Sequence, residues 1–173
     1  MKIVFASSNE NKVVEVNQKL GDAFEVIGLH DLGFDEEIVE DGETLEENAR
    51  IKARCIWSRF AMNCFADDTG LLVDALDGAP GVYSARYAGP QRNAEDNMQK
   101  LMQALADSPN RRARFQTSIC LILDGVEYMF EGQVSGQIVQ ERHGEGGFGY
   151  DPIFIPDGHT RTFAEMSLEE KNV

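Results

Sequence analysis

The first 21 residues change from a strand pattern to a helix pattern, and this change restricts the fold more than any other feature. Residues 2–6 form a short apolar run that ends at Ser7-Ser8-Asn9, as expected for a buried strand. From Asn11 onward, apolar residues recur at helical spacing until Gly21, namely Val13, Val16 and Leu20. The chain therefore begins with a strand, a polar loop and a helix.

The rest of the sequence interleaves the same two patterns. Thr44 to Glu47 is a capping-box sequence that predicts a second helix, whose apolar face is Leu45, Ala49, Ile56 and Phe60. A third amphipathic helix is predicted around Met98, Leu101, Met102 and Leu105. Strands are predicted at 63–66, 115–123, 126–130 and 153–155, with a turn at 67–70 and a hairpin turn at Asp124-Gly125. These elements indicate an α/β protein with a mixed sheet.

The net charge of the chain limits the functional classes to which it can belong. Thirty acidic and sixteen basic residues give a formal net charge of −14, which disfavours a nucleic-acid binder because a phosphate backbone would be repelled. The basic cluster at residues 111–114 is expected to be a solvated turn just before a strand. An anionic ligand would have to be bound by local donors and by a metal ion.

Length and the absence of targeting signals favour one cytoplasmic domain. The 173 residues fit a single domain, no apolar run is long enough to span a bilayer, and the first residues lack the pattern of a signal peptide. The three cysteines are widely spaced and are expected to be reduced (Cys55, Cys64, Cys120).

The first candidate site is the polar segment Ser7-Ser8-Asn9-Glu10-Asn11-Lys12. It lies where a strand leads into a helix, and the N–H groups and dipole of a helix N-terminus favour an anion. Lys12 adds a positive charge there. The segment has no Walker-type glycine pattern, and the same residues also fit an ordinary N-cap.

The second candidate combines acidic residues with a lysine. Asp67 and Asp68 follow a predicted strand, and magnesium prefers one or two carboxylates together with water and substrate phosphates. A turn explains the same two residues equally well. The stretch 35–47, which contains Glu40, holds eight carboxylates; most are expected to be solvated, and one of them could complete a metal site with Asp68. Lys52 falls on the apolar stripe of its helix, where it either snorkels to solvent or reaches a buried anion.

The third candidate is the loop Gly146-Gly147-Phe148-Gly149-Tyr150-Asp151. Glycines let a backbone approach a ligand closely, and an aromatic ring can stack on a base. A flexible connection with core aromatics is the alternative interpretation of this segment.

Taken in order, six segments resemble the inosine triphosphate pyrophosphatase family, also called the Ham1-like or non-standard purine NTP pyrophosphatases. The segments are SSNENK, ENARIKA, ADDTGL, GAPGVYSARYAG, GGFGYDPIF and FAEMSLEEKN, which together run from residue 7 to residue 172. The resemblance implies a central mixed β-sheet flanked by helices, two lobes with a cleft between them, and a homodimer. It also implies hydrolysis of ITP, dITP or XTP to the monophosphate and pyrophosphate.

The resemblance also implies roles for individual residues. Ser7, Asn9, Lys12 and Lys52 would bind the triphosphate, Glu40 and Asp68 would bind Mg²⁺, and Asp68 would accept a proton. From the residues themselves, Asp68 could either hold the metal or orient and deprotonate the water, with Asp67 as its partner. The remaining substrate contacts implied by the resemblance are Thr69, Arg86, Phe148, Gly149, Tyr150, Asp151 and Lys171. The family continues into a Ser-His-Arg motif and a final helix after the segment at which this sequence ends, so we expect residues 1–173 to be a truncated domain.

The expected reaction is attack by water on the α-phosphorus, with pyrophosphate as the leaving group held by Lys12 and Lys52. A site that donates a hydrogen bond to a 6-oxo group would reject the 6-amino group of ATP. Two alternatives stay open at this stage. One is a nucleotide-binding module without catalysis, and the other is a phosphatase with an aspartyl-phosphate intermediate at Asp68.

Overall fold

The computed structural model describes residues 1–147, 149–167 and 170, and it confirms the mixed α/β class. The chain forms two compact units, each built from two segments. Unit 1 comprises Met1–Asp68 with Thr117–Glu131, and unit 2 comprises Thr69–Gln116 with Gly132–Val173. Strands β3 (Cys64–Val73), β5 (Arg112–Leu123) and β6 (Val126–Ile138) contribute residues to both units.

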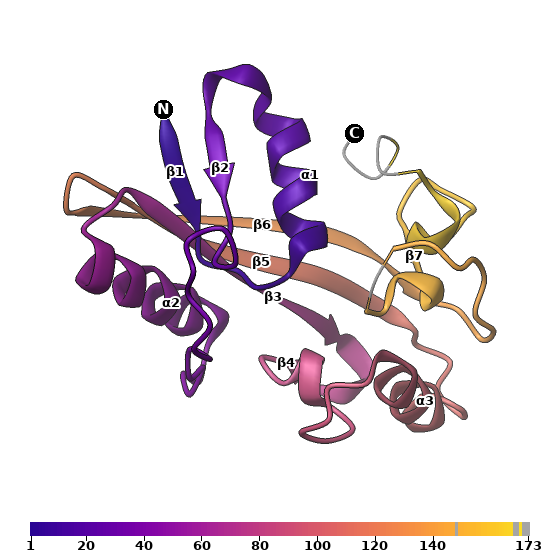
Figure 1. Cartoon of the computed structure of the whole chain (residues 1–173). Coiled ribbons are helices and arrows are strands. Elements are labelled where there is room, and N and C mark those ends of the chain that lie inside the picture. Colours follow the sequence, from indigo (N-terminus) through magenta and orange to yellow (C-terminus); the bar gives the residue numbers. More distant parts are fainter. Residues whose placement is uncertain (148, 168–169, 171–173) are drawn as a thin grey trace. The chain divides into compact units, whose positions relative to one another are not determined.

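Unit 1 begins with the predicted strand, loop and helix. Strand β1 (Lys2–Phe5) leads into helix α1 (Glu10–Leu20), which Asn9 caps at its start and Gly21 ends with a φ of 65°. Strand β2 (Glu25–Ile27) follows a short 3-10 turn and pairs in parallel with β1. Strand β3 pairs in parallel with the other edge of β1, and the strand order in this unit is β2-β1-β3-β5-β6 (Figure 1).

Two hydrophobic clusters of unit 1 use alternate residues of β3. Phe65 packs against Phe5 in the cluster that includes Val13 and Val16 of α1. The flanking residues Cys64 and Ala66 belong to the cluster that includes Ala49, Ala53 and Ile56 of helix α2 (Leu45–Phe60). Because side chains alternate along a strand, consecutive residues of β3 face different helices. The side chains of the polar residues after Ala66 alternate between the two faces in the same way.

Unit 2 has its own core. Strand β4 (Pro80–Gly81) pairs antiparallel with the second half of β3, and β7 (Phe154–Pro156) pairs antiparallel with the end of β6. Helix α3 (Ala94–Ala104), predicted from its apolar spacing, contributes Met98 and Leu101 to this core. Short 3-10 turns connect the elements at Asp74–Leu76, Ser84–Arg86, Asp151–Ile153 and Phe163–Glu165.

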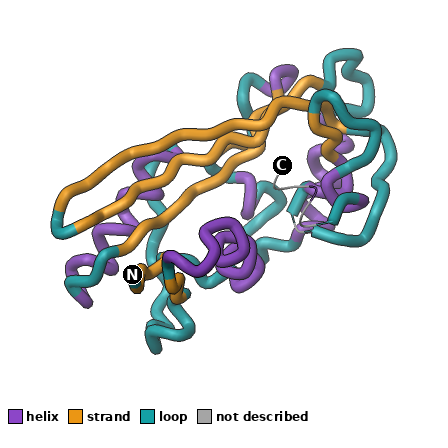
Figure 2. Tube along the Cα trace, turned by 90° about the horizontal axis from the view of Figure 1, so that it is seen from above, coloured by secondary structure: helices purple, strands orange, loops and turns teal. Residues whose placement is uncertain are grey.

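The predicted hairpin forms between β5 and β6, which are neighbours in the sheet (Figure 2). Both residues of its two-residue turn have positive φ, 50° at Asp124 and 84° at Gly125, as in the type I′ turns that suit twisted strands. The returning strand continues to Ile138 rather than ending at Phe130. Among the described residues, no helix is both long enough and apolar enough to cross a membrane.

The prediction that the second strand ends in a turn at residues 67–70 is wrong. Strand β3 continues through Asp67 and Asp68 to Val73, because Leu71 and Leu72 pair with Gly81 and Pro80 of β4. Strand β1 nevertheless pairs with β3 only as far as Phe65. The two aspartates therefore lie just beyond the parallel part of the sheet.

The predicted solvated turn at the arginine cluster is also wrong. Arg112 begins β5, and the next residue, Ala113, is buried. The Arg111 guanidinium donates hydrogen bonds to three backbone carbonyls, those of Leu105, Ile138 and Val139, at 2.8–2.9 Å. Arg111 is thus structural, since it joins the end of α3 to the end of β6, whereas Arg112 is exposed.

Candidate functional site

The segment between β1 and α1 forms a capped helix start. Asn9 accepts hydrogen bonds at its Oδ1 from the backbone N–H groups of Asn11 at 3.0 Å and Lys12 at 3.4 Å. Ser7 Oγ accepts one from the N–H of Asn9 at 3.1 Å. Ser8, Glu10 and Asn11 are exposed, while Lys12 is half-buried. The N-cap interpretation is confirmed, and the same geometry places Lys12 on the first turn of α1.

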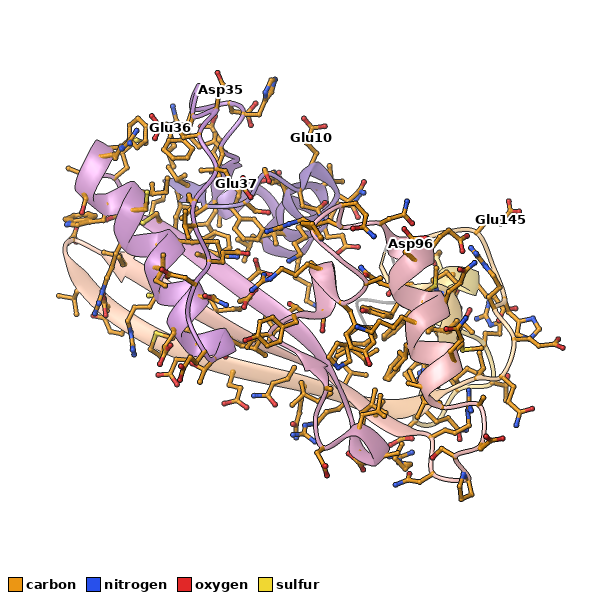
Figure 3. All side chains as sticks on the ribbon, turned by 90° about the horizontal axis from the view of Figure 1, so that it is seen from below. Glu10, Asp35, Glu36, Glu37, Asp96 and Glu145 are labelled. Atoms are coloured by element: carbon orange, nitrogen blue, oxygen red, sulfur yellow. The ribbon has the colours of Figure 1, made fainter. Side chains whose placement is uncertain are left out.

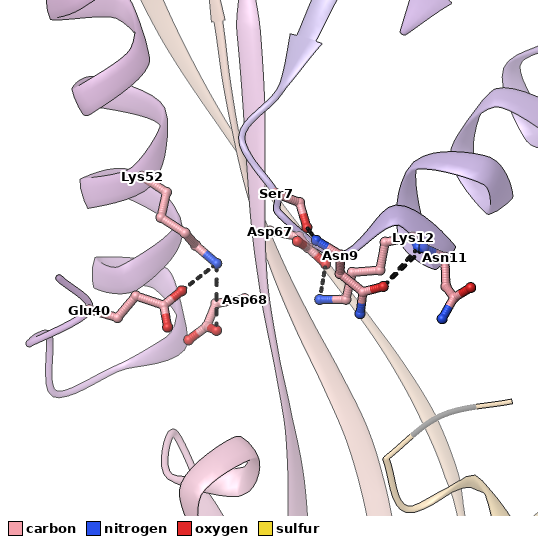
Figure 4. A network of polar contacts seen from close by, with 8 residues as sticks. All are labelled: Ser7, Asn9, Asn11, Lys12, Glu40, Lys52, Asp67 and Asp68. Atoms are coloured by element: carbon pink, nitrogen blue, oxygen red, sulfur yellow. Dashed lines mark hydrogen bonds and ion pairs between the residues drawn. The ribbon is translucent and has the colours of Figure 1, made fainter. Parts of the chain in front are cut away.

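Asp67 faces this helix start. Its Oδ2 lies 3.1 Å from Lys12 Nζ, on the face of the sheet that α1 covers (Figure 4). Its other carboxylate oxygen, Oδ1, is buried and has no hydrogen-bond partner. Burying a carboxylate oxygen without a partner is unfavourable, so this atom is suited to accept from a bound group.

Asp68 faces the other helix. Lys52 Nζ lies 2.7 Å from Glu40 Oε1 and 3.9 Å from Asp68 Oδ1, so one ammonium group serves both carboxylates (Figure 4). The three side chains are 12–18% exposed. Lys52 reaches these anions instead of snorkelling to solvent, because its place on the buried stripe of α2 directs it toward β3.

Glu40 differs from the other carboxylates of the acidic stretch. The other seven are exposed, in agreement with the predicted solvated loop (Asp35, Glu36, Glu37, Asp41, Glu43, Glu46, Glu47). Figure 3 labels three of them, along the loop before α2. Glu40 is half-buried and turned toward Lys52. The metal-binding role that the resemblance implies for Glu40 stays a prediction.

The protonation of Asp68 is strongly affected by its surroundings. Burial raises the pKa of Asp68 from its ordinary value of 3.8 to about 6; Lys52 opposes this rise, and the nearby charge of Glu40 adds to it. A carboxylate with a pKa of about 6 is a better proton acceptor near neutral pH than an ordinary aspartate. A strongly shifted pKa with a specific charge partner is typical of functional sites.

Asn48 was not singled out by the sequence analysis, although it contacts the site. Its Nδ2 donates to Asp68 Oδ2 at 3.2 Å, and its Oδ1 accepts from the backbone N–H of Gly42 at 2.8 Å. The side chain is almost fully buried. Its position four residues before Lys52, on the same helical face, is the sequence signal that could have identified it.

The donor set of Glu40 and Asp68 fits a hard divalent cation. Two carboxylates already share one positive group, and magnesium commonly takes one or two protein carboxylates and completes its shell with water and phosphate. The described residues contain no cluster of three or more acidic, histidine or cysteine side chains arranged to hold a metal.

Unit 2 brings together two other predicted contacts. Tyr150 is buried, and its hydroxyl donates to the backbone carbonyl of Ser84 at 2.7 Å. The guanidinium of Arg86, two residues further on, lies 5.1 Å from the centre of the Tyr83 ring. Tyr150 is therefore anchored to the turn that carries Arg86, and its ring belongs to the core.

The remaining predicted contacts of unit 2 are less informative. Thr69 and Gly149 are half-buried, with Gly149 in the left-handed region at a φ of 59°, and Asp151 is buried. Phe148 and Lys171 lie outside the described residues.

The alternation of Asp67 and Asp68 argues against an aspartyl-phosphate phosphatase, because that chemistry needs both aspartates to face one substrate.

Comparisons with known proteins identify the family of this chain. A sequence model described as the Ham1 family matches residues 3–173. Two bacterial relatives, from Flavobacterium johnsoniae and Porphyromonas gingivalis, are both named dITP/XTP pyrophosphatase. Each is 50% identical over 172 residues, which covers 99% of this chain and 90% or 89% of the relative.

Solved structures give the same result. The Ham1 protein of Staphylococcus aureus has a TM-score of 0.88 at 40% identity, and a HAM1 protein from Coxiella burnetii has a TM-score of 0.89 at 39% identity. Each match covers 99% of this chain and 90% of the other. The fold expected from the resemblance is therefore shared with these proteins.

Proposed function

Since this chain belongs to the Ham1 family, we propose that it hydrolyses non-standard purine nucleoside triphosphates to the monophosphate and pyrophosphate. The substrates are dITP, XTP and ITP, in line with the activity that names its relatives. The observation that carries the proposal is the arrangement of Glu40 and Asp68 around Lys52, beside a helix start that presents Lys12. Removal of such nucleotides from the cellular pool is the biological role that follows.

Mg²⁺ is the proposed cofactor, with Glu40 and Asp68 as its protein ligands. The support is the donor set, since the two carboxylates converge on a single cationic group. When bound, the ion neutralises charge on the phosphate oxygens.

The chain's own residues bind and orient the substrate. The segment Ser7 to Lys12 receives the triphosphate at the N-terminus of α1, where the helix dipole favours an anion. Lys12 and Lys52 stabilise the pyrophosphate as it leaves, and Asp68 accepts the proton of the attacking water. The raised pKa of Asp68 supports this role. Asp67 holds Lys12 in place from the opposite face of β3.

Base recognition is assigned to unit 2. The proposed contacts are Thr69, Arg86, the segment 148–151 and Lys171. The hydrogen bond from Tyr150 to Ser84 supports a fixed position for the backbone at Tyr150, and a fixed backbone can discriminate a 6-oxo from a 6-amino group by its hydrogen-bonding pattern.

The setting of the enzyme is also a proposal. We place it in the cytoplasm, because its three cysteines are free, as is usual in a reducing compartment. We further propose that the two units act as one catalytic domain and that the enzyme is a homodimer. Val126, Tyr128 and Phe130 are about half exposed and alternate along β6, which gives an apolar surface for a second copy.

The decisive assay compares nucleotides and identifies products. Purified protein with Mg²⁺ is expected to release pyrophosphate and monophosphate from dITP, XTP and ITP, and much less from ATP. Release of orthophosphate would contradict the bond assignment, and equal rates with ATP would contradict the selectivity. Nucleotide binding without any product would instead identify a binding module.

A further inference from the structure

Asn48 connects two parts of the proposed metal site. It is the fourth residue of α2, and its side chain is 1% exposed. One end of its amide contacts Asp68 on β3, and the other contacts Gly42 in the loop that carries Glu40. The two proposed metal ligands are thus joined through a single buried side chain.

The chemistry of the partners fixes the orientation of this amide. The backbone N–H of Gly42 can only donate, so the atom facing it must be the carbonyl oxygen of Asn48. An ionised Asp68 can only accept, so the atom facing it must be the amide nitrogen. Aspartate lacks the donor and leucine lacks both groups, so neither could make both hydrogen bonds.

The loop lies unusually close to α2 at Gly42. A Cβ added to this glycine would sit 2.7 Å from Asn48 Oδ1 and 2.7 Å from Glu47 Cβ, closer than such atoms approach one another. Absence of a side chain therefore permits the hydrogen bond between Gly42 and Asn48. Glu40 is only two residues before Gly42. The distance between this loop and α2 therefore determines where the carboxylate of Glu40 lies.

We propose that Asn48 is a positioning residue that holds Glu40 and Asp68 at the separation required for one shared cation. The inference rests on the proposed function, and it adds a residue that touches neither the phosphates nor the metal. Loss of a partner that orients a metal ligand commonly weakens metal affinity by roughly 10- to 100-fold.

The proposed test measures binding rather than turnover. The probe is an ITP analogue with a methylene group in place of the oxygen between the α- and β-phosphorus, titrated by calorimetry with Mg²⁺ and with EDTA. In the wild-type protein, Mg²⁺ is expected to lower the Kd. In Asn48→Leu, which keeps the branching of asparagine and adds no charge, the Kd with Mg²⁺ is expected to rise roughly tenfold, with the Kd in EDTA unchanged.

Asn17→Leu is the matched control. Asn17 also bridges two groups through its amide, donating to the carbonyl of Val26 at 3.2 Å and accepting from its N–H at 3.3 Å. The substitution removes two hydrogen bonds within the same unit but contacts no carboxylate of the site. It is expected to lower thermal stability while keeping the Mg²⁺ effect on the Kd.

The outcomes separate the inference from the proposed function. A wild-type Mg²⁺ effect that survives in Asn48→Leu would overturn the inference and leave the function intact. A wild-type protein that neither hydrolyses ITP nor responds to Mg²⁺ would overturn both. If Asn48→Leu does not fold by circular dichroism, Gly42→Ala disturbs the same link from the loop, and an unchanged Mg²⁺ effect there would overturn the inference.

Discussion

Asp67 and Asp68 are consecutive in β3, yet their carboxylates bind lysines from different helices. Asp67 pairs with Lys12 of α1, and Asp68 faces Lys52 of α2. Strand alternation produces this division, so two adjacent acids serve two separate parts of one site. Their contributions to catalysis should therefore be separable by mutation.

Asp68→Asn is expected to lower kcat by about 10²- to 10⁴-fold, because it removes the proposed proton acceptor and a proposed metal ligand. Asp67→Asn keeps both of those groups and disturbs only the partner of Lys12. It is expected to raise KM for ITP and to lower kcat far less. Steady-state pyrophosphate release from ITP checks both variants. Equal losses of kcat would show that the two acids act as a unit.

The raised pKa of Asp68 predicts a pH dependence of stability. Between pH 3.8 and about 6, the folded chain keeps a proton that the unfolded chain has lost. The stability contributed by this proton is present below the lower value and is lost as pH rises through the upper one. In EDTA, Asp68→Asn is therefore expected to be more stable than wild type by about 1–2 kcal/mol near pH 8, and no more stable near pH 3.

Urea unfolding at the two pH values measures this difference directly. Asp22→Asn is a suitable control, because Asp22 is exposed in the turn after α1. Its stability should follow that of wild type at both pH values. A destabilised Asp68→Asn near pH 8 would mean that the pairing with Lys52 outweighs the cost of burial.

Removal of the shared ammonium should reveal the repulsion between Glu40 and Asp68. Lys52→Met is expected to lower the free energy of unfolding by about 2 kcal/mol in EDTA, between the values typical of exposed and buried ion pairs. Added Mg²⁺ should raise the Tm of this variant more than that of wild type, because the ion replaces the missing charge. Lys2→Met, at an exposed position on β1, provides the control. An equal Mg²⁺ effect in all three proteins would contradict the proposed ligands.

The exposed apolar residues of β6 predict the surface of the proposed homodimer. Tyr128→Glu places a charge among Val126 and Phe130 and is expected to convert the dimer into a monomer, because burial of that charge is unfavourable. Light scattering after size exclusion measures the mass. Val14→Glu changes an equally exposed residue on α1 and should leave the mass unchanged. A monomeric wild-type protein would disprove the dimer itself.

Local signals explain most of what the sequence predicted correctly. The Thr44 cap begins α2, the spacing of Val13 and Val16 defines α1, and Asp124-Gly125 turns the hairpin, because each is governed by neighbours along the chain. The selection of Glu40 and Lys52 came from family resemblance. From its helical spacing alone, Lys52 could either extend to solvent or contact a buried anion.

Long-range pairing explains what the sequence missed. Residues 67–70 have good turn chemistry, but pairing of Leu71 and Leu72 with β4 extends the strand through them. The sequence favours solvent for the arginine cluster because two of the three acceptors of Arg111 are distant in sequence, on the end of β6 and just beyond it. Asn48 was overlooked for the same reason, since Asp68 lies 20 residues away.

The composition of unit 1 has a consequence for biosynthesis. The residues of the proposed metal and phosphate site all lie within the first 68 positions of the chain. Cys120 and Ile122, which belong to the hydrophobic core of unit 1, are translated about fifty residues later. The nascent chain must therefore carry an incomplete apolar surface on α2 and β3 throughout the synthesis of residues 69–116. The core of unit 1 is therefore completed only after the hairpin between β5 and β6 has been translated.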